Sequence, residues 1–207
     1  MKPTLALMSF LSLASATVLF DFSTTNDLVL EHDTDGTNSP NPIPSTGSAS
    51  LNTGTFSWGN LTSDTTPNTA TFNSGSFEAY DWGGSGTFES SVIDVSGLSF
   101  VKISAIGSTN HNAASEYFQF FYQLDNDALV TLAEGAALDV ETHVDGSINQ
   151  LDVSNATSLV VGFTFSHNGG TNNAKVQTLS VSSIPEPQSL ALLSIAGVVM
   201  TGRRSRR

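Results

Sequence analysis

The residues best suited to chemistry lie in two short polar segments in the middle of the chain. EAYDWGGSG places Tyr80 and Trp82 on either side of Asp81, and STNHNAASEY adds Asn110 and His111. Aromatic rings stack on the apolar faces of sugar rings, while carboxylate and amide groups hydrogen-bond to sugar hydroxyls. Tyr80 and Trp82 share one face if they lie on a strand, and that face is either a ligand-binding surface or part of the core. These five residues are the candidate carbohydrate site.

A second candidate is a cation site in HDTDGTN, where Asp33, Asp35 and Asn38 surround a glycine. Hard oxygen ligands in a glycine-containing loop suit Ca²⁺, but the segment lacks the closing glutamate of an EF-hand. An ordinary acidic loop is the alternative interpretation. The four histidines, at positions 32, 111, 143 and 167, are too dispersed for a zinc site, and the chain has no cysteine. No other cofactor is indicated.

Catalytic patterns are scarce. WGGSG (residues 82–86) holds a serine among glycines, but residue 87 is threonine, so the segment does not fit the Gly-x-Ser-x-Gly nucleophile elbow and we expect a flexible turn. Glycoside hydrolysis needs two carboxyl groups about 5 to 9 Å apart. The acids that could serve are scattered along the chain, at Glu78, Asp81, Glu89, Glu116, Glu134 and Glu141. We therefore expect no enzyme activity and assign no catalytic residue.

Strands must position these residues, because apolar residues alternate with polar ones along the middle of the chain. The alternation is clearest in SLVVGFTFSH, YFQFFYQLD, LSFVKISAIG and TVLFDFS, and weaker in GTFESSVIDV, ALVTLA, INQLDV and AKVQTLSVSS. The expected one-sided sets are Leu159, Val161, Phe163 and Phe165; Phe118, Phe120, Tyr122 and Leu124; Val101, Ile103 and Ala105; and Val18, Phe20 and Phe22.

Turn residues separate these strands at Asp125-Asn126-Asp127, Asp145-Gly146 and Gly169-Gly170. No amphipathic helix is expected before Gln188. Many short strands at this spacing predict an all-β fold, an antiparallel β-sandwich or jelly roll. The segment from Thr34 to Gly54 is rich in Pro, Gly, Ser, Thr and Asn, so we expect a long surface loop there.

Charge is distributed unevenly along the chain. Between residues 17 and 183 there are two basic and eighteen acidic residues, a net charge of −16. Such a surface repels phosphate backbones, which excludes nucleic acid as a partner. It suits solubility, cation binding or neutral ligands such as sugars.

The two ends have the pattern of processing segments. Lys2, an apolar run from Leu5 to Leu13 and the small residues Ala14 and Ala16 have the order of a secretory signal peptide with its cleavage site. We therefore expect a signal peptide over residues 1–16, one sandwich domain over 17–183 and a separate tail over 184–207.

That tail, with IPEP, an apolar stretch and RRSRR, resembles the PEP-CTERM sorting signal of bacteria that build extracellular polysaccharide, a motif also described as an ice-binding protein C-terminal motif. The resemblance implies recognition at Pro185-Glu186-Pro187 by a membrane transpeptidase of the exosortase class. The eleven residues from Leu190 to Met200 would form a short transmembrane helix of about 16 Å, against a hydrocarbon core of about 30 Å. The basic residues that stop it at the cytoplasmic side are Arg203, Arg204, Arg206 and Arg207.

About half of the chain also resembles the galactose-binding-like or laminin-G-like jelly rolls appended to bacterial surface proteins. The segments are SSVIDVSGLSFVKISAIGS, EYFQFFYQLDNDALVTLAEG and VSNATSLVVGFTFSHNGGTNNAKVQTLSVSS. The closing segment NNAKVQTLSV departs from the commoner form, because it lacks Asp-Asn before the last strand, so the family's ligand role does not carry over to that position.

Together these features predict an exported protein that is anchored briefly in the inner membrane and then reaches the cell surface or the extracellular matrix. We expect a non-catalytic role, with extracellular polysaccharide as the ligand. A secreted hydrolase acting on that polysaccharide and a purely structural coat protein are the alternatives.

Overall fold

The structure is a computed structural model that describes residues 15–22, 28–32, 46–60, 62, 68–73, 76–80, 83–110, 113–135, 141–168 and 173–185, with backbone only at 28–32, 68–73 and 80. Within these ranges the chain forms fifteen β-strands, and every strand pair is antiparallel. The described residues contain no helix long and apolar enough to cross a membrane. The predicted all-β, antiparallel class is confirmed.

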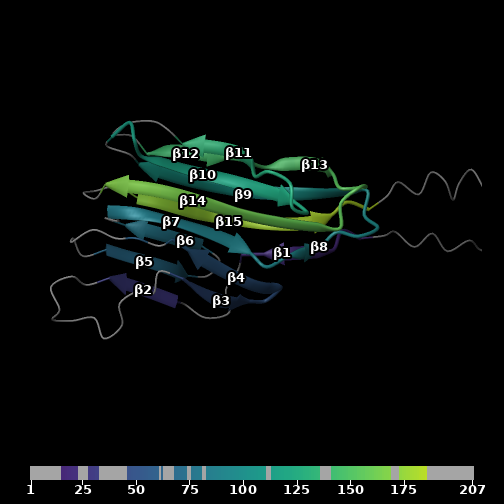
Figure 1. The fold of residues 1–207 in the computed structure, drawn as a ribbon, viewed down its shortest axis with the longest axis horizontal. Helices are drawn as coiled ribbons and strands as arrows, with labels where there is room; N and C mark the ends of the chain where they lie inside the picture. Colours follow the sequence, from purple (N-terminus) through teal and green to yellow (C-terminus); the bar gives the residue numbers. More distant parts are fainter. Residues whose placement is uncertain are drawn as a thin grey trace, which may run out of the picture. The chain divides into compact units, whose positions relative to one another are not determined.

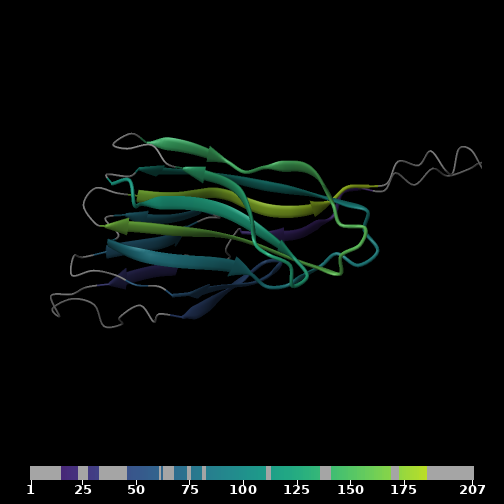
Figure 2. The same cartoon turned by 45° about the horizontal axis from the view of Figure 1, so that its top comes forward.

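The strands form two sheets, and the strand axes of the two sheets are nearly aligned with each other (Figure 1 and Figure 2). Sheet A has the order β12-β9-β15-β6-β5-β2, with β1 on β15 and β13 on β9. Its strands are β1 (Val18–Asp21), β2 (Leu28–His32), β5 (Asn68–Asn73), β6 (Ser76–Tyr80), β9 (Phe100–Asn110), β12 (Thr142–Asp145), β13 (Ile148–Asp152) and β15 (Asn173–Ser183). Sheet B has the order β11-β10-β14-β7-β4-β3, with β8 on β14. Its strands are β3 (Gly47–Leu51), β4 (Gly54–Gly59), β7 (Gly83–Ser90), β8 (Ile93–Asp94), β10 (Tyr117–Leu124), β11 (Val130–Gly135) and β14 (Ser158–Asn168).

Phenylalanine rings join the two sheets. Phe163 of β14 stacks on Phe88 of β7, with ring centroids 4.8 Å apart. It also meets Phe77 of β6, on the opposite sheet, at 5.0 Å. All three rings are fully buried. Aromatic pairs at these separations add to the free energy gained from burying their area, so the predicted sandwich has an aromatic centre.

The strongest predicted strands are confirmed, with the expected faces inward. Every predicted inward residue of β9 and β14 is buried. In β10, Phe118 and Phe120 are buried, while Tyr122 and Leu124 are partly buried and pack against the core. The four weaker predictions correspond to β7 with β8, to β11, to β13 and to β15. Period-two patterning therefore located the strands with the most regular apolar alternation.

Turn chemistry was also predicted correctly where the structure describes it. Asp125-Asn126-Asp127 follows β10 in the hairpin to β11, and Asp125 has a φ of 47°, in the left-handed region that Asp and Asn tolerate. Asp145-Gly146 separates β12 from β13. Gly169-Gly170 lies outside the described residues.

The prediction of a surface loop over residues 34–54 is wrong for the last part of this segment. Residues 47–51 form β3, which pairs with β4 in a hairpin. Leu51 is buried, and Ala49 is partly buried against the core. This stretch has few apolar residues, but those few face inward on a strand whose backbone hydrogen bonds are supplied by β4.

Two further expectations need correction. The flexible turn expected over WGGSG is instead strand from Gly83 onward, because β7 pairs with β14 from its first residue. In β1, Val18 does not join Phe20 and Phe22 in the core; it is 55% exposed, because the pairing with β15 shifts between Val18 and Phe20.

The chain divides into two units, and all described strands belong to the one spanning Thr17–Ile184. The other comprises Met1–Ala16 and Pro185–Arg207. Of the proposed cleavage residues, Ala16 is described and is exposed, whereas Ala14 lies outside the described residues. Pro185 is the last described residue, so Glu186, Pro187, the apolar stretch and the four tail arginines also lie outside them.

Candidate functional site

The two polar segments of the predicted carbohydrate site meet at one end of sheet A. Asn173, the first residue of β15, pairs with Asn110, the last residue of β9, and also with Tyr80, the last residue of β6. The backbone therefore sets Tyr80, Asn173 and Asn110 in one row across three neighbouring strands. Asp81, Trp82 and His111 lie outside the described residues, as does the side chain of Tyr80.

Asn173 is a site residue that the sequence did not reveal. The sequence places it only next to the closing strand, and no local pattern distinguishes it from the other asparagines of the chain. Its position follows from the register of β15 between two strands that come from distant parts of the sequence.

Asn110 and Asn173 lie on the outer face of sheet A, since Thr109 and Ala174, their neighbours in the chain, are fully buried on the inner face. The side-chain Oδ1 atoms of Asn110 and Asn173 are buried, and neither has a hydrogen-bond partner among the described residues. Both atoms are acceptors, and a buried acceptor without a donor is costly. Within the described residues, these two oxygens therefore remain without a donor.

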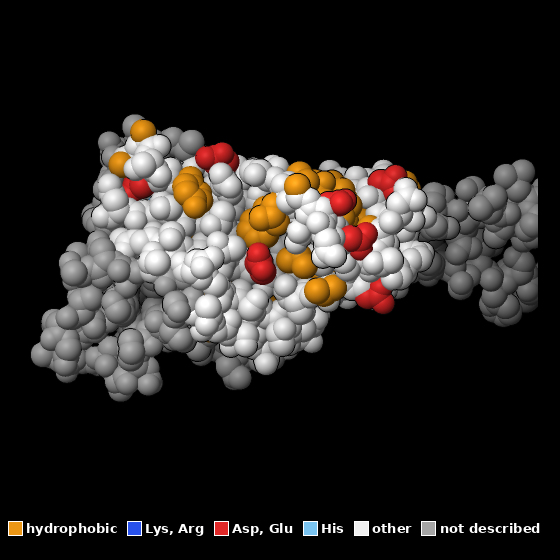
Figure 3. Space-filling view, in the orientation of Figure 1, with side chains coloured by type: hydrophobic (Ala, Val, Ile, Leu, Met, Phe, Trp, Pro, Cys, Tyr) orange, Lys and Arg blue, Asp and Glu red, His pale blue; other side chains and the backbone are white. Residues whose placement is uncertain are grey.

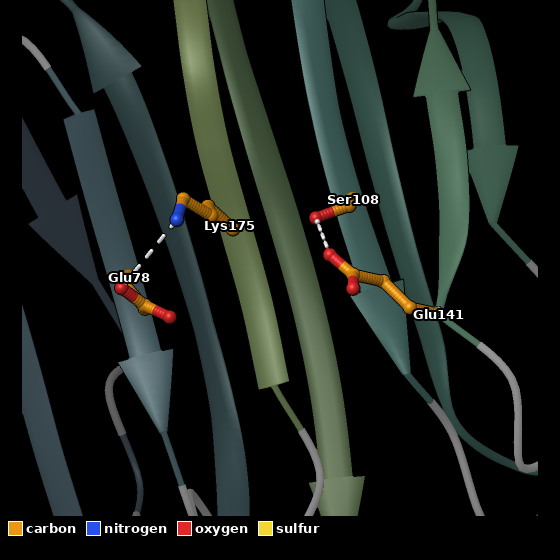
Figure 4. Close-up of polar contacts among 4 residues, drawn as sticks. All are labelled: Glu78, Ser108, Glu141 and Lys175. Carbon is orange, nitrogen blue, oxygen red and sulfur yellow. Dashed lines mark hydrogen bonds and ion pairs between the residues drawn. The ribbon is translucent and has the colours of Figure 1, made fainter.

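The next row of the same face carries charged and hydroxyl groups (Figure 4). Lys175 of β15 points toward Glu78 of β6, with Nζ 3.8 Å from Oε2. Beside this pair, the Ser108 hydroxyl of β9 donates to Glu141 Oε1 at 2.9 Å. Both partners of the ion pair are more than one third exposed, so the pair adds less than about 1 kcal/mol to folding stability. Its charges lie at the surface of the site, beside the asparagine row.

Behind this face, polar groups hold the end of the sandwich together. Thr109 Oγ1 donates to the backbone carbonyl of Asn173 at 3.0 Å and lies 3.5 Å from His167 Nε2. Glu116 accepts from the backbone N–H groups of Ala113 and Asn168, at 2.9 and 2.7 Å. Glu116 therefore links the β9–β10 connection to the end of β14, which is a structural use of a buried carboxylate.

Asp33, Asp35 and Asn38, the calcium candidates, lie outside the described residues. Within the described residues, no group of three or more His, Cys, Asp or Glu side chains is placed to hold a metal ion.

At the connections of β10, β11, β13 and β14, Asp125, Asp127 and Asp152 line a hollow of about 300 Å³. The Asp152 Oδ1 atom accepts from Ser154 N at 2.9 Å and from Ser154 Oγ at 2.7 Å, and these bonds hold the pKa of Asp152 below its ordinary value. Asp125 accepts from Thr157 and Ser158 in the same way. Two of the three acids are thus turn-stabilising groups.

Comparison with known proteins adds structural neighbours but no family. No family model matches the chain, and no curated protein matches it. Among solved structures, the chain is similar to a xylan-binding module, CBM15, at 15% identity and a TM-score of 0.38, covering 69% of this chain and 98% of that one. It is similar to TmCBM61 in complex with β-1,4-galactotriose at 8% identity and a TM-score of 0.37, covering 55% and 73%. It is also similar to the Stig cyclase Fisc from Fischerella sp. TAU at 10% identity and a TM-score of 0.35, covering 84% and 100%. Likenesses at this level carry no argument about function, which depends on the side chains of a site.

Proposed function

We propose that the chain is an exported, non-catalytic protein of the cell surface or extracellular matrix, and that its sandwich binds polysaccharide at the end of sheet A. The observation that supports this is the row of Tyr80, Asn173 and Asn110, in which two buried carboxamide oxygens have no donor among the described residues. Sugar hydroxyls are donors that such oxygens accept from. The adjoining Glu78–Lys175 pair supplies further groups of both signs.

The charge of the domain favours neutral polysaccharides over acidic ones. Between residues 17 and 183 the net charge is −16. On the face drawn in Figure 3, acidic side chains are spread over the described surface and no described lysine or arginine is visible. A polymer of uronic acids or sulfated sugars would be repelled by such a surface.

A glycan array probed with the purified protein tests this proposal. We expect Asn110→Ala and Asn173→Ala each to weaken binding about tenfold, which corresponds to the loss of about one hydrogen bond. Trp82→Ala should also weaken binding, because its ring would stack on the sugar. Asn149→Ala is the matched control, since Asn149 is an exposed asparagine on β13. Equal binding by all four variants would exclude this site.

Two alternatives make different predictions for the same protein. A hydrolase would release shorter oligosaccharides from extracellular polysaccharide, so measurable turnover would exclude the non-catalytic role. A structural coat protein would show neither turnover nor glycan binding while accumulating in the matrix.

We also propose that both ends of the chain are removed during export. The order of cation, apolar run and Ala-x-Ala supports cleavage after Ala16, and the order of Pro185-Glu186-Pro187, apolar stretch and arginines supports processing by an exosortase-type transpeptidase. Proline on both sides of Glu186 is expected to favour an extended backbone, which would suit recognition by an enzyme.

A further inference from the structure

A second polar hollow lies on the other sheet, between β4 and β7. It has a volume of about 200 Å³ and is lined by Ser57, Trp58, Gly59, Asn60, Thr87 and Glu89. Pockets for drug-sized ligands begin at about 300 Å³, so this hollow suits a group no larger than one sugar ring. It belongs to sheet B and shares no residue with the row of Tyr80, Asn173 and Asn110.

The register of the two strands explains the hollow. Ser57 pairs with Glu89, and Gly59 pairs with Thr87. Phe88 is buried in the core, so its neighbours Thr87 and Glu89 face outward. A Cβ atom at Gly59 would have nothing within 4 Å. The hollow is thus the open space above Gly59, with Thr87 and Glu89 beside it.

The hydrogen bonds of the Thr87 and Thr164 hydroxyls determine whether Thr87 can donate to a ligand in this hollow or only accept from it. Thr164 Oγ1 donates its only proton to the Gly86 carbonyl at 3.1 Å. In the 3.2 Å contact between Thr87 Oγ1 and Thr164 Oγ1, Thr164 must therefore accept and Thr87 must donate. With its proton engaged, the Thr87 hydroxyl can act only as an acceptor toward the hollow.

Glu89 adds acceptors of the same kind. Among the described residues, no hydrogen bond or ion pair involves the Glu89 carboxylate. Thr87 and Glu89 together present lone pairs, and the neighbouring Asn60 and Ser57 can adapt as donors or acceptors. A ligand with hydroxyl donors fits this arrangement, whereas a carboxylate or sulfate would meet the negative charge of Glu89.

We propose that this hollow is a second binding site, which takes one hydroxylated, uncharged sugar unit of a polysaccharide. The domain then contacts carbohydrate through two sites on different sheets. Two sites on one domain can bridge neighbouring chains, or hold one chain more tightly than either site alone.

Calorimetric titration of the purified protein with neutral hexasaccharides of glucose, galactose, mannose and xylose tests the second site, with hexagalacturonate as the acidic comparison. Gly59→Leu fills the hollow, and Glu89→Gln removes the charge while keeping the shape. We expect each change to weaken binding of at least one neutral hexasaccharide about tenfold or more, the factor for a lost hydrogen bond to a charged group. Glu134→Gln, an exposed carboxylate on β11, should leave binding unchanged.

The outcomes separate this site from the one on sheet A. Binding that falls in the Gly59 and Glu89 variants but not in Asn173→Ala supports the second site alone, and the reverse result overturns it while leaving the first. Absence of binding to every neutral hexasaccharide overturns it, as does equal affinity for hexagalacturonate. Should Gly59→Leu fail to fold, as judged by circular dichroism, Glu89→Gln decides the question.

Discussion

At the residue scale, the carboxylate of Asp125 accepts several hydrogen bonds from a distant part of the chain. Its Oδ1 atom accepts from Thr157 N and Oγ1 at 3.0 and 2.8 Å, and from Ser158 N and Oγ at 2.9 and 3.1 Å. These bonds, led by that of the Thr157 hydroxyl, lower the pKa of Asp125 below its ordinary value of 3.8. The side chain thereby links the β10–β11 hairpin to the start of β14.

A lowered pKa in the folded state makes the stabilising effect of Asp125 depend on pH. Its contribution is fully present above the unfolded-state value of 3.8 and is lost as the pH falls through the lower folded-state pKa. We therefore expect Asp125→Ala to lower the melting temperature at neutral pH. The difference from wild type should shrink in strong acid to the pH-independent cost of placing alanine at a φ of 47°. Thermal unfolding monitored by circular dichroism over an acid pH series measures this.

Asp127→Ala is the matched control for Asp125, because no hydrogen bond of the Asp127 carboxylate to another described residue is seen. It should leave both the melting temperature and its pH dependence close to those of wild type. A difference between wild type and Asp125→Ala that stays constant into strong acid would contradict the role assigned to the carboxylate.

Three turns repeat one local motif that the sequence displays. Asp94, Asp145 and Asp152 each accept from the backbone N–H of the serine two residues later, at 2.9 Å. Asp-x-Ser in these places is a turn signal that needs no tertiary information. Asn173 had no such signal, since its role depends on which strands lie beside β15. The sequence therefore allows the local hydrogen bonds of these turns to be predicted. It does not show that Asn173 lies between Tyr80 and Asn110 at the end of sheet A.

At the element scale, the spacing between β14 and its neighbours depends on a glycine. A Cβ atom at Gly162 would lie 2.3 Å from the Phe88 backbone oxygen and 2.5 Å from Phe121 Cζ. Phe121, on β10, is only 4% exposed although it lies outside the core cluster. The absence of a side chain at Gly162 lets the Phe121 ring pack against the strand.

Gly162→Ala should therefore destabilise the domain by about 1 to 3 kcal/mol, the usual cost of overpacking. Gly59→Ala is the control, because its Cβ would enter open space, and we expect a change within about 0.5 kcal/mol. Urea unfolding of the two variants beside wild type measures both free energies. Equal stability of the two variants would show that β14 and β10 can move apart at no cost.

The strands that were missed differ physically from those that were predicted. β9 and β14 each bury four or more alternating residues, so their patterns are visible without any partner. β4 buries only Phe56 and Trp58 and is rich in small polar residues. Its strand conformation depends on hydrogen bonds from β3 and β7, which a single stretch of sequence does not reveal.

At the scale of the whole molecule, the domain and the tail differ in the sign of their charge. Between residues 17 and 183 the chain has only two basic residues, whereas its last five residues include four arginines. In the proposed export, positive charge behind an apolar stretch would hold that end on the cytoplasmic side of the membrane. A stretch of only eleven residues is short for a hydrocarbon core of about 30 Å, so the proposed anchor would suit a segment that is later cut off.

We therefore expect that replacing Pro185-Glu186-Pro187 by three alanines leaves the protein in the membrane fraction of its own cells, with the tail uncut. The control replaces Pro42-Ile43-Pro44, another Pro-x-Pro tripeptide of the chain, and should not affect release. Fractionation followed by mass spectrometry of the mature ends measures both results. Release of the first variant at the wild-type level would contradict processing at Pro-Glu-Pro, and a full-length wild-type chain in the cytoplasm, from Met1 to Arg207, would contradict export itself.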